Sequence, residues 1–412
     1  MHRMLCFFLS AGLLAFAPAQ WPAIPGGLAA EFAVEGTNER TKEEPETVRL
    51  AWEACWRSAG MPVKTGAAAG AGEAAGAEEE TTAPQEEMPH EVPLEEAQEA
   101  LRQAVGRMEQ PPAVILPEGM EAQEAEITLL NAYYAVLAET PEYKYAYALE
   151  TEVEGDRAFC TLCYMPYRTG SYPEEFVGKE VGSLRELIEA AESNLHEEEL
   201  LIRITDPELQ VDDMQRALQQ VGGGYFLCEL NKDATAIQFK PHGGLEREEC
   251  LQKLKEAETL AKEVLAQRQR EGQTQEELAR DLYSYLTENV KYDFRYYSEP
   301  EAMPMDSTTA YGALHDGLAI CGGYAHALQT LFALAGIPCY TVSGVSGGEA
   351  HMWNIALVDG EWLYYDATRD RGCKPEYFSV CGVTADELRN GIFSYSWEEE
   401  RIAPLLEDPR RF

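Results

Sequence analysis

The chain has 412 residues, of which 45% are hydrophobic and 25% are charged. These values are ordinary for a globular protein, so they exclude wholesale disorder, and the length corresponds to two or three domains. Asp and Glu number 72 against 33 Lys and Arg, giving a formal net charge of -39, and such a surface excludes nucleic acid as an expected partner because it repels phosphate backbones.

Residues 1–19 have the pattern of a secretory signal peptide. Arg3 supplies a positive start, residues 4–17 form an apolar run, and Ala17-Pro18-Ala19 offers a cleavage site between small residues. The run is shorter than the roughly 20 residues that span a bilayer, so we expect cleavage rather than anchoring, with a buried N-terminal helix as the alternative. We therefore expect a secreted protein, extracellular or at the cell surface, with no stable membrane insertion after signal removal.

Residues 20–92 are typical of a linker rich in Ala, Gly, Glu and Pro. Residues 66–80 are of low complexity, and residues 31–100 hold 17 acidic side chains against 5 basic ones. Such a composition cannot bury enough apolar area to offset chain entropy, so it predicts a disordered acidic linker.

Residues 93–243 predict a duplicated α+β module. Each copy has the order helix, strand, helix, strand, strand, because helical and alternating patterns follow one another in that order twice. The predicted elements of the two copies are, in turn, helix 94–108, strand 113–116, helix 127–137 and strands 145–152 and 157–164, then helix 184–194, strand 200–204, helix 211–220 and strands 225–230 and 234–240. No catalytic constellation occurs here, and we expect a spacer or recognition module.

The cysteines outside the signal are even in number once Cys321 is set aside, which permits disulfides in an exported chain. Cys160 and Cys163 form a lone C-x-x-C within a predicted strand. Side chains three apart on a strand face opposite ways, so we expect these two thiols to pack rather than to share a metal.

The sequence pattern predicts a helical connector over residues 244–274. It predicts the domain that carries the chemistry over residues 275–412. Leucines and alanines keep helical spacing on both sides of Gly272, which separates two predicted helices.

Another predicted helix begins at Cys321. Residues 325–335 have helical periodicity, and Gly336 ends the helix. The unpaired N–H groups and the positive end of the dipole at a helix start favour thiolate over thiol. Gly322 and Gly323 would let a substrate backbone approach closely.

Residues 351–368 predict a β-hairpin. Asp359-Gly360 separates two apolar runs, which is a strong signal for a two-residue turn. With these two residues in the loop, Val358 faces Glu361, and the residue numbers of each facing pair sum to 719.

This register places a histidine and an aspartate on one face of the hairpin. Trp353 opposes Asp366 and His351 opposes Thr368, so His351 and Asp366 are diagonal neighbours, about 7–8 Å apart at the backbone. A carboxylate at that distance can reach the imidazole. The same face carries Ile355, Leu357, Trp362 and Tyr364, and we expect it to pack on the helix that begins at Cys321.

Three residues together supply the parts of a catalytic triad. The nucleophile would be Cys321, the general base His351 and the orienting carboxylate Asp366. The Cys321 backbone N–H could donate to the oxyanion. A metal site using His315 with His351 and Asp366 lacks metal-type spacing, and we expect no metal and no cofactor. Tyr292 and Tyr311 could line the cleft or could belong to the core.

At these residues the sequence resembles the transglutaminase-like superfamily, and more narrowly its exported bacterial members. The matching motifs are G-x-x-x-C-G-G-Y-A at 317–325, G-I-P at 336–338, H-x-W-N at 351–354 and W-x-x-x-D-x-T at 362–368. The resemblance implies a papain-like α+β fold and a catalytic triad of Cys321, His351 and Asp366. Members include protein cross-linkers, amide hydrolases, cysteine proteases and catalytically dead relatives.

We therefore expect an exported thiol enzyme that acts on amide bonds of proteins or peptides through an acyl-enzyme on Cys321. A cell-wall peptide is among the candidate substrates. We favour hydrolysis over transamidation because water is ubiquitous and nothing in the sequence marks an amine site. The alternative is a non-catalytic cell-surface binding or scaffold protein that keeps the same fold.

Overall fold

The computed structural model describes residues 90–409. The predicted signal peptide, and the predicted linker up to residue 89, lie outside the described residues. Strand β1 begins at Glu91, so the end of the segment predicted as linker, up to residue 92, is already part of the first module. Within residues 90–409, no helix is long and apolar enough to cross a membrane.

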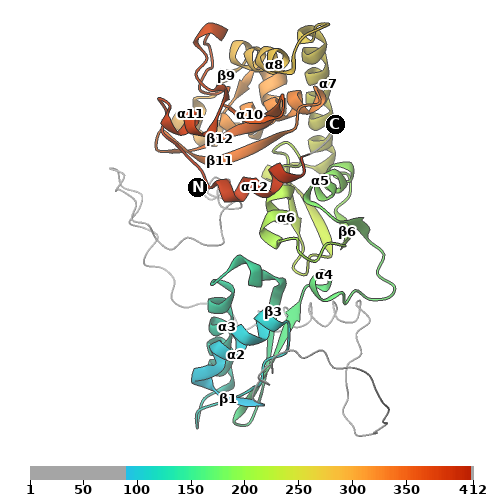
Figure 1. The fold of residues 1–412 in the computed structure, drawn as a ribbon, viewed down its shortest axis with the longest axis vertical. Coiled ribbons are helices and arrows are strands. Elements are labelled where there is room, and N and C mark those ends of the chain that lie inside the picture. The colour runs from blue at the N-terminus through green and yellow to red at the C-terminus, as the bar shows by residue number, and fades with distance from the viewer. Residues whose placement is uncertain (1–89, 410–412) are drawn as a thin grey trace. The chain divides into compact units, whose positions relative to one another are not determined.

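The first module is a four-stranded sheet with two helices (Figure 1). Its strands lie in the order β1-β2-β4-β3, with β1 and β2 parallel and the other neighbours antiparallel. The elements are β1 (Glu91–Pro93), α2 (Ala97–Arg107), β2 (Ala113–Ile115), α3 (Ala122–Leu137), β3 (Ala146–Glu154) and β4 (Arg157–Tyr164), followed by the short helix α4 (Pro166–Thr169).

The second module repeats this topology. Its strands lie in the order β5-β6-β8-β7, again with the first two parallel and the others antiparallel. The elements are β5 (Lys179–Val181), α5 (Leu184–Ser193), β6 (Glu199–Ile204), α6 (Val211–Leu218), β7 (Phe226–Leu230) and β8 (Ala236–Pro241). The sequence pattern missed the first strand of each copy, because three residues are too few to establish an alternation.

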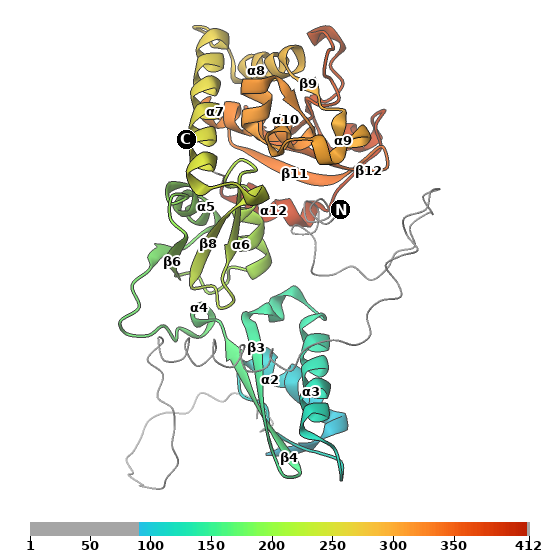
Figure 2. The ribbon, with the colours of Figure 1, turned by 180° about the vertical axis from the view of Figure 1, so that it is seen from behind.

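The C-terminal domain, residues 247–409, places helices against a five-stranded antiparallel sheet in the order β14-β13-β12-β11-β15 (Figures 1 and 2). A two-stranded sheet pairs β9 with β10. Its elements are α7 (Arg247–Arg268), α8 (Gln275–Asn289), β9 (Lys291–Tyr292), α9 (Arg295–Ser298), β10 (Leu318–Ala319), α10 (Cys321–Leu334), β11 (Cys339–Ser346), β12 (Glu349–Val358), β13 (Glu361–Tyr365), β14 (Cys381–Val383), α11 (Ala385–Asn390), β15 (Tyr395–Ser396) and α12 (Glu399–Glu407).

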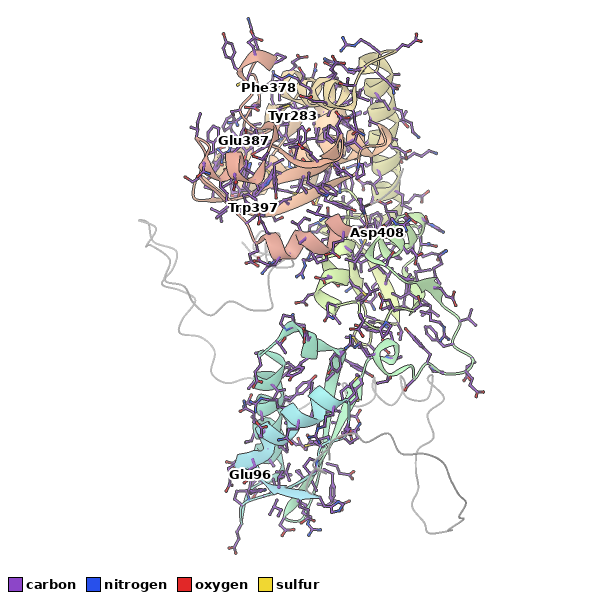
Figure 3. The ribbon with its side chains drawn as sticks, viewed as in Figure 1. Glu96, Tyr283, Phe378, Glu387, Trp397 and Asp408 are labelled. Atoms are coloured by element: carbon purple, nitrogen blue, oxygen red, sulfur yellow. The ribbon has the colours of Figure 1, made fainter. Side chains whose placement is uncertain are left out.

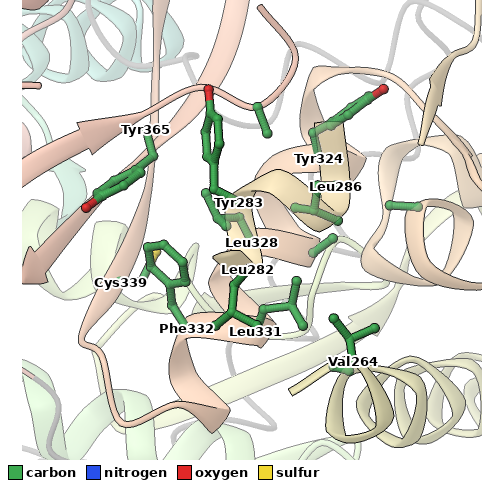
Figure 4. Close-up of a cluster of buried hydrophobic side chains, with 14 of the residues drawn as sticks. Val264, Leu282, Tyr283, Leu286, Tyr324, Leu328, Leu331, Phe332, Cys339 and Tyr365 are labelled. Carbon is green, nitrogen blue, oxygen red and sulfur yellow. The ribbon is translucent and has the colours of Figure 1, made fainter. Parts of the chain in front are cut away.

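The core of this domain forms where α7, α8 and α10 meet the sheet (Figure 4). Helix α10 is mostly apolar and is buried on most of its sides, as expected of a helix that is covered by its neighbours. Helix α7, predicted as part of a connector, contributes Ala257, Ala261 and Val264 to this core and so packs as part of the C-terminal domain. Helix α8 begins at a capping box in which Thr274 and Glu277 satisfy each other's backbone N–H groups.

The predicted hairpin and its register are confirmed. Asp359 and Gly360 both have positive φ, at 49° and 88°, as a two-residue hairpin turn requires. The pairs run from Val358 with Glu361 to Asn354 with Tyr365. Strand β13 then ends, so Asp366 is not a ladder partner of Trp353 but the first residue beyond the strand.

The face of the sheet that covers α10 is the opposite of the predicted one. Ala356, Val358 and Tyr365 share the core with α10, and the ring of Phe332 lies 5.2 Å from that of Tyr365. The predicted face, which includes Trp353 and Tyr364, instead packs against Trp397 of the C-terminal segment. Both faces of the sheet are apolar and buried, so alternation alone could not assign the helix to one of them.

Residues 307–309 pack tightly against the first turn of α10. A Cβ atom added to Gly323 would lie 2.7 Å from the Ser307 carbonyl oxygen and 3.0 Å from that of Thr309. The Ile320 N–H also donates to the Ser307 carbonyl at 2.8 Å. The glycine therefore makes room for the protein's own backbone.

Replacing Gly323 by Ala should lower the free energy of unfolding by about 2–3 kcal/mol, because the added methyl group overpacks this contact. Urea denaturation followed by circular dichroism measures the change. Gly106→Ala is the matched control: it lies within α2, where the new methyl group meets nothing closer than 3.6 Å, and should raise stability by up to about 1 kcal/mol. A Gly323→Ala protein as stable as the wild type would contradict the packing.

Candidate active site

Cys321 is the first residue of α10 and is half-buried. Its neighbour Ile320 is the N-cap, and among the described residues no side chain caps this helix end. The N–H groups of the first turn therefore stay available to an anion, and the helix dipole adds positive potential there. The expectation that Gly322 and Gly323 admit a substrate backbone is wrong, because residues 307–309 occupy the space beside both glycines.

His351 lies on β12, where its backbone faces Gly344 of β11. Its side chain is 9% exposed, and its ring lies 6.1 Å from that of Trp353. Nε2 is 2.7 Å from Oδ2 of Asp366. Because Nε2 faces the carboxylate, Nδ1 is the ring nitrogen left for the sulfur of Cys321.

Asp366 is 1% exposed and is compensated on both carboxylate oxygens. Oδ2 accepts a hydrogen bond from the Tyr395 hydroxyl at 2.6 Å in addition to facing His351, and Oδ1 accepts from the Thr368 N–H at 3.1 Å. The guanidinium of Arg369 is 4.0 Å away. A buried carboxylate is costly without such partners, so this set holds both the charge and its direction.

A second buried carboxylate fixes the backbone around Asp366. Asp370 accepts hydrogen bonds from the backbone N–H groups of Ser379 and Val380 and from the hydroxyl of Tyr283. The same Tyr283 hydroxyl lies 2.8 Å from the Asp366 carbonyl oxygen. Tyr283 is packed edge-on against Phe378, with 5.1 Å between ring centroids. Both residues are labelled in Figure 3. The turn after β13 is therefore pinned to α8.

The pKa shifts show that the three side chains interact. Burial alone would lower the pKa of His351, but the charge and hydrogen bond of Asp366, followed by Cys321, outweigh burial and raise it to about 9. Burial opposes ionisation of Asp366, yet His351, Tyr395 and Arg369 hold the pKa of that carboxyl below its usual value. The raised pKa of His351 and the lowered pKa of Asp366 favour an imidazolium that faces the Asp366 carboxylate.

The sequence missed Tyr395, which donates to Asp366 and lies on the two-residue strand β15. Its ring is 5.2 Å from that of Trp353. It lies 29 residues beyond Asp366, and a two-residue strand leaves no periodic signal, so no local pattern could have pointed to it.

Both aromatic candidates, Tyr292 and Tyr311, are partly buried and pack against the core of the domain. Tyr292 pairs with Ala319, two residues before Cys321, and lies at the site. Tyr311 instead stacks on His315, with 4.5 Å between the ring centroids.

The other thiols are in different surroundings. All eight cysteines within residues 90–409 are unpaired. Burial raises the pKa of Cys160 and Cys163 on β4 to about 11, and that of Cys228 and Cys381 to about 12. These four thiols are therefore poor nucleophiles at neutral pH.

Comparison with known proteins gives a family match within the C-terminal domain. The model of the transglutaminase-like superfamily matches residues 262–367. Kyphoscoliosis peptidase from Homo sapiens is 25% identical over 122 residues, which are 27% of this chain and 18% of that protein. The chain thus spans less than a fifth of the length of that relative.

Two solved structures are also similar. A TGase crystal structure is 14% identical, with a TM-score of 0.27, over 38% of this chain and 49% of that chain. A candidate cysteine protease from Cytophaga hutchinsonii is 18% identical, with a TM-score of 0.22, over 33% of this chain and 51% of that chain. The protein has an α+β fold, and its residues 262–367 form a core that matches the transglutaminase-like superfamily.

Proposed function

We propose that the protein is a thiol enzyme that acts on amide bonds of proteins or peptides through an acyl-enzyme on Cys321. The observation that carries the proposal is the 2.7 Å contact between His351 and the buried Asp366, on an imidazole that also interacts with Cys321. A nucleophile, a base and an orienting group in this order are the parts that acyl transfer requires. Cys321, His351 and Asp366 are the proposed catalytic residues.

In the proposed reaction, the Cys321 thiolate attacks the amide carbon, and the carbonyl oxygen becomes an oxyanion near the uncapped first turn of α10. The His351 imidazolium then gives its proton to the departing amine, which leaves a thioester on Cys321. Water attacks the thioester and gives a proton to His351, and the acid product departs. Asp366 stays ionised throughout and holds the ring.

We favour water over an amine as the acceptor, which makes the protein an amidase or protease. We also propose that it works outside the cytoplasm, because residues 1–19 have the pattern of a signal peptide. Extracellular proteins and cell-wall peptides are then the candidate substrates.

Iodoacetamide should alkylate Cys321 faster than any other cysteine, and Cys321→Ala should reduce turnover of a glutamine-containing peptide panel about 10³-fold or more. Peptide mass mapping measures the first effect and product mass spectrometry the second. Cys373→Ala, which removes another partly exposed thiol, is the control and should keep wild-type turnover.

Deamidation or cleavage in the product mass would indicate hydrolysis, and an amine adduct would indicate transamidation. Labelling of Cys321 no faster than that of Cys373, together with no turnover of any peptide, would favour the non-catalytic binding or scaffold protein.

The free energy of unfolding should fall as the pH rises from about 6.5 to about 9. His351 has its pKa raised from 6.5 to about 9, so in this range the folded protein holds a proton that the unfolded chain has lost. The stabilisation is complete below pH 6.5 and lost above about pH 9, a change of about 3 kcal/mol. Urea denaturation across this range measures it.

His351→Ala should flatten that pH dependence, whereas His315→Ala, at an exposed histidine with a side chain that is 50% exposed, should keep the wild-type slope. A wild-type protein whose stability does not change between these pH values would contradict an ionised His351–Asp366 pair.

Tyr395→Phe should lower kcat about tenfold with little change in KM, because the Asp366 carboxylate loses one donor and orients His351 less firmly. The pH profile of kcat should shift as well. Tyr377→Phe is the control, since Tyr377 is 70% exposed. A variant that loses stability but keeps the wild-type kcat and pH profile would show that Tyr395 acts on folding alone.

A further inference from the structure

A row of aromatic side chains lies beside Cys321 on the segment from Tyr292 to Tyr297. The row begins at Tyr292, whose backbone pairs with Ala319 in the β9–β10 ladder, two residues before Cys321. The next residue, Asp293, donates its N–H to the Ala319 carbonyl at 3.0 Å. The aromatic segment is thus tied to the chain that leads into the nucleophile.

The rings of this segment contact one another and remain open to solvent. Ring centroids are 5.2 Å apart between Tyr292 and Phe294, 6.1 Å between Tyr292 and Tyr297, and 4.9 Å between Tyr296 and Tyr297. Phe294 is 60% exposed and Tyr297 is 55% exposed. Scattered exposed apolar residues are common, but a contiguous group next to a nucleophile is typical of a binding surface.

The far end of the segment reaches the strand that carries His351. The Tyr297 hydroxyl donates to Oε2 of Glu349 at 2.8 Å. Glu349 begins β12 and lies two residues before His351, so both side chains emerge from the same side of the strand. Tyr292, Phe294, Tyr296, Tyr297 and Glu349, together called the aromatic rim, therefore span from the Cys321 side of the site to the His351 side.

The buried side chain of Asp293 holds the rim in place. Asp293, only 2% exposed, forms two 2.8 Å hydrogen bonds with the Arg295 guanidinium and accepts a third from the Ser307 hydroxyl at 2.6 Å. The buried charge of Asp293 is thus neutralised by a residue of the same segment. Three anchored contacts reduce the ordering entropy that a ligand would otherwise have to overcome.

Glu349 is an exposed carboxylate within the rim, and the nearby arginines are held by other groups. Arg295 is bound to Asp293, and Arg369 donates to the Ser346 backbone and hydroxyl. Arg371 donates to the Thr368 carbonyl and lies 5.0 Å over the Tyr292 ring. Glu349 is exposed, and the Tyr297 hydroxyl is a neutral donor, so the negative charge of Glu349 is not cancelled by this contact.

We propose that the aromatic rim binds a lysine or arginine side chain of a polypeptide substrate, next to the amide that Cys321 attacks. The inference rests on the proposed function and names the substrate class for it. The apolar stem of such a side chain packs on the rings of Phe294 and Tyr297, and its cation lies against the rings and the Glu349 carboxylate. The net charge of -39 favours the approach of basic polypeptides over acidic ones.

The first test needs no substrate. Cys321 in the full chain is labelled with two methanethiosulfonate reagents of similar size, one carrying a trimethylammonium group and one a sulfonate, and the rates are normalised to a neutral reagent. Glu349→Gln should lower the cation-to-anion rate ratio about three- to tenfold at low salt, and high salt should reduce the wild-type ratio. Glu361→Gln, an exposed carboxylate at the opposite end of the same hairpin, should leave the ratio unchanged.

The second test uses peptides that differ only at the residue beside a glutamine, which is Lys, Leu or Glu. The full chain with Cys321→Ser should bind the Lys peptide at least about tenfold more tightly than the Glu peptide, and either Phe294→Ala or Glu349→Gln should reduce this preference. A rate ratio unaffected by Glu349→Gln, or a Leu peptide that binds as well as the Lys peptide, would overturn the rim as a cation site.

Failure of the proposed function gives a different result. In one outcome, Glu349→Gln changes the rate ratio and the peptide preference, but no peptide is turned over. That result would support the rim as a site for basic peptides and would contradict the proposed catalysis. If peptides are turned over with no preference for Lys, the proposed catalysis is supported and the inference that the rim binds a cationic side chain is overturned.

Discussion

The carboxylate of Asp366 carries its charge where only 1% of the residue is exposed. Four residues of the C-terminal domain compensate that charge: His351, Thr368, Arg369 and Tyr395. One oxygen faces His351 and accepts from Tyr395, and the other accepts from the backbone of the following turn. Burying the charge strengthens each of these interactions and makes each costly to lose. The direction of the imidazole, and with it the site, depends on this single buried group.

Two further buried carboxylates are also satisfied by hydrogen bonds, and these bonds fix the chain around the site. Asp370 pins the turn that carries Asp366 to α8 through Tyr283. Asp293 joins the aromatic segment to Ser307, whose carbonyl lies against the first turn of α10. Cys321, His351 and the aromatic rim are each positioned by a satisfied buried charge. Such a charge resists small displacements better than apolar packing because hydrogen bonds are directional.

The fold brings these groups together from segments that are distant along the chain. Strand β15, with Tyr395, pairs with β11 at the edge of the sheet, and Trp397 covers the sheet face that α10 leaves open. Gly344 makes this arrangement feasible, because a Cβ there would clash with the Ser396 carbonyl oxygen and would lie 2.6 Å from Trp353. The C-terminal segment thus completes both the core and the hydrogen bonding of Asp366.

The sequence by itself determined the features that depend on neighbours along the chain. Asp359-Gly360 determines the hairpin register, and the apolar spacing after Cys321 determines the helix that it begins. Helix 127–137 was also expected, although α3 begins earlier, at Ala122, because its polar first turn shows no apolar stripe. Short-range turn geometry and side-chain periodicity are sufficient for features of this kind.

Three features were decided only by the tertiary structure. They are the face of the hairpin that meets α10, the backbone contacts that leave no room for a Cβ at Gly323, and the hydrogen bond from Tyr395 to Asp366. Each of these depends on contacts between segments far apart in sequence. Both sheet faces carry apolar residues, and a two-residue strand has no period, so the local pattern does not decide between them. The physical reason is that packing is decided by which surfaces exclude water together, and a single segment contains only one of the two surfaces.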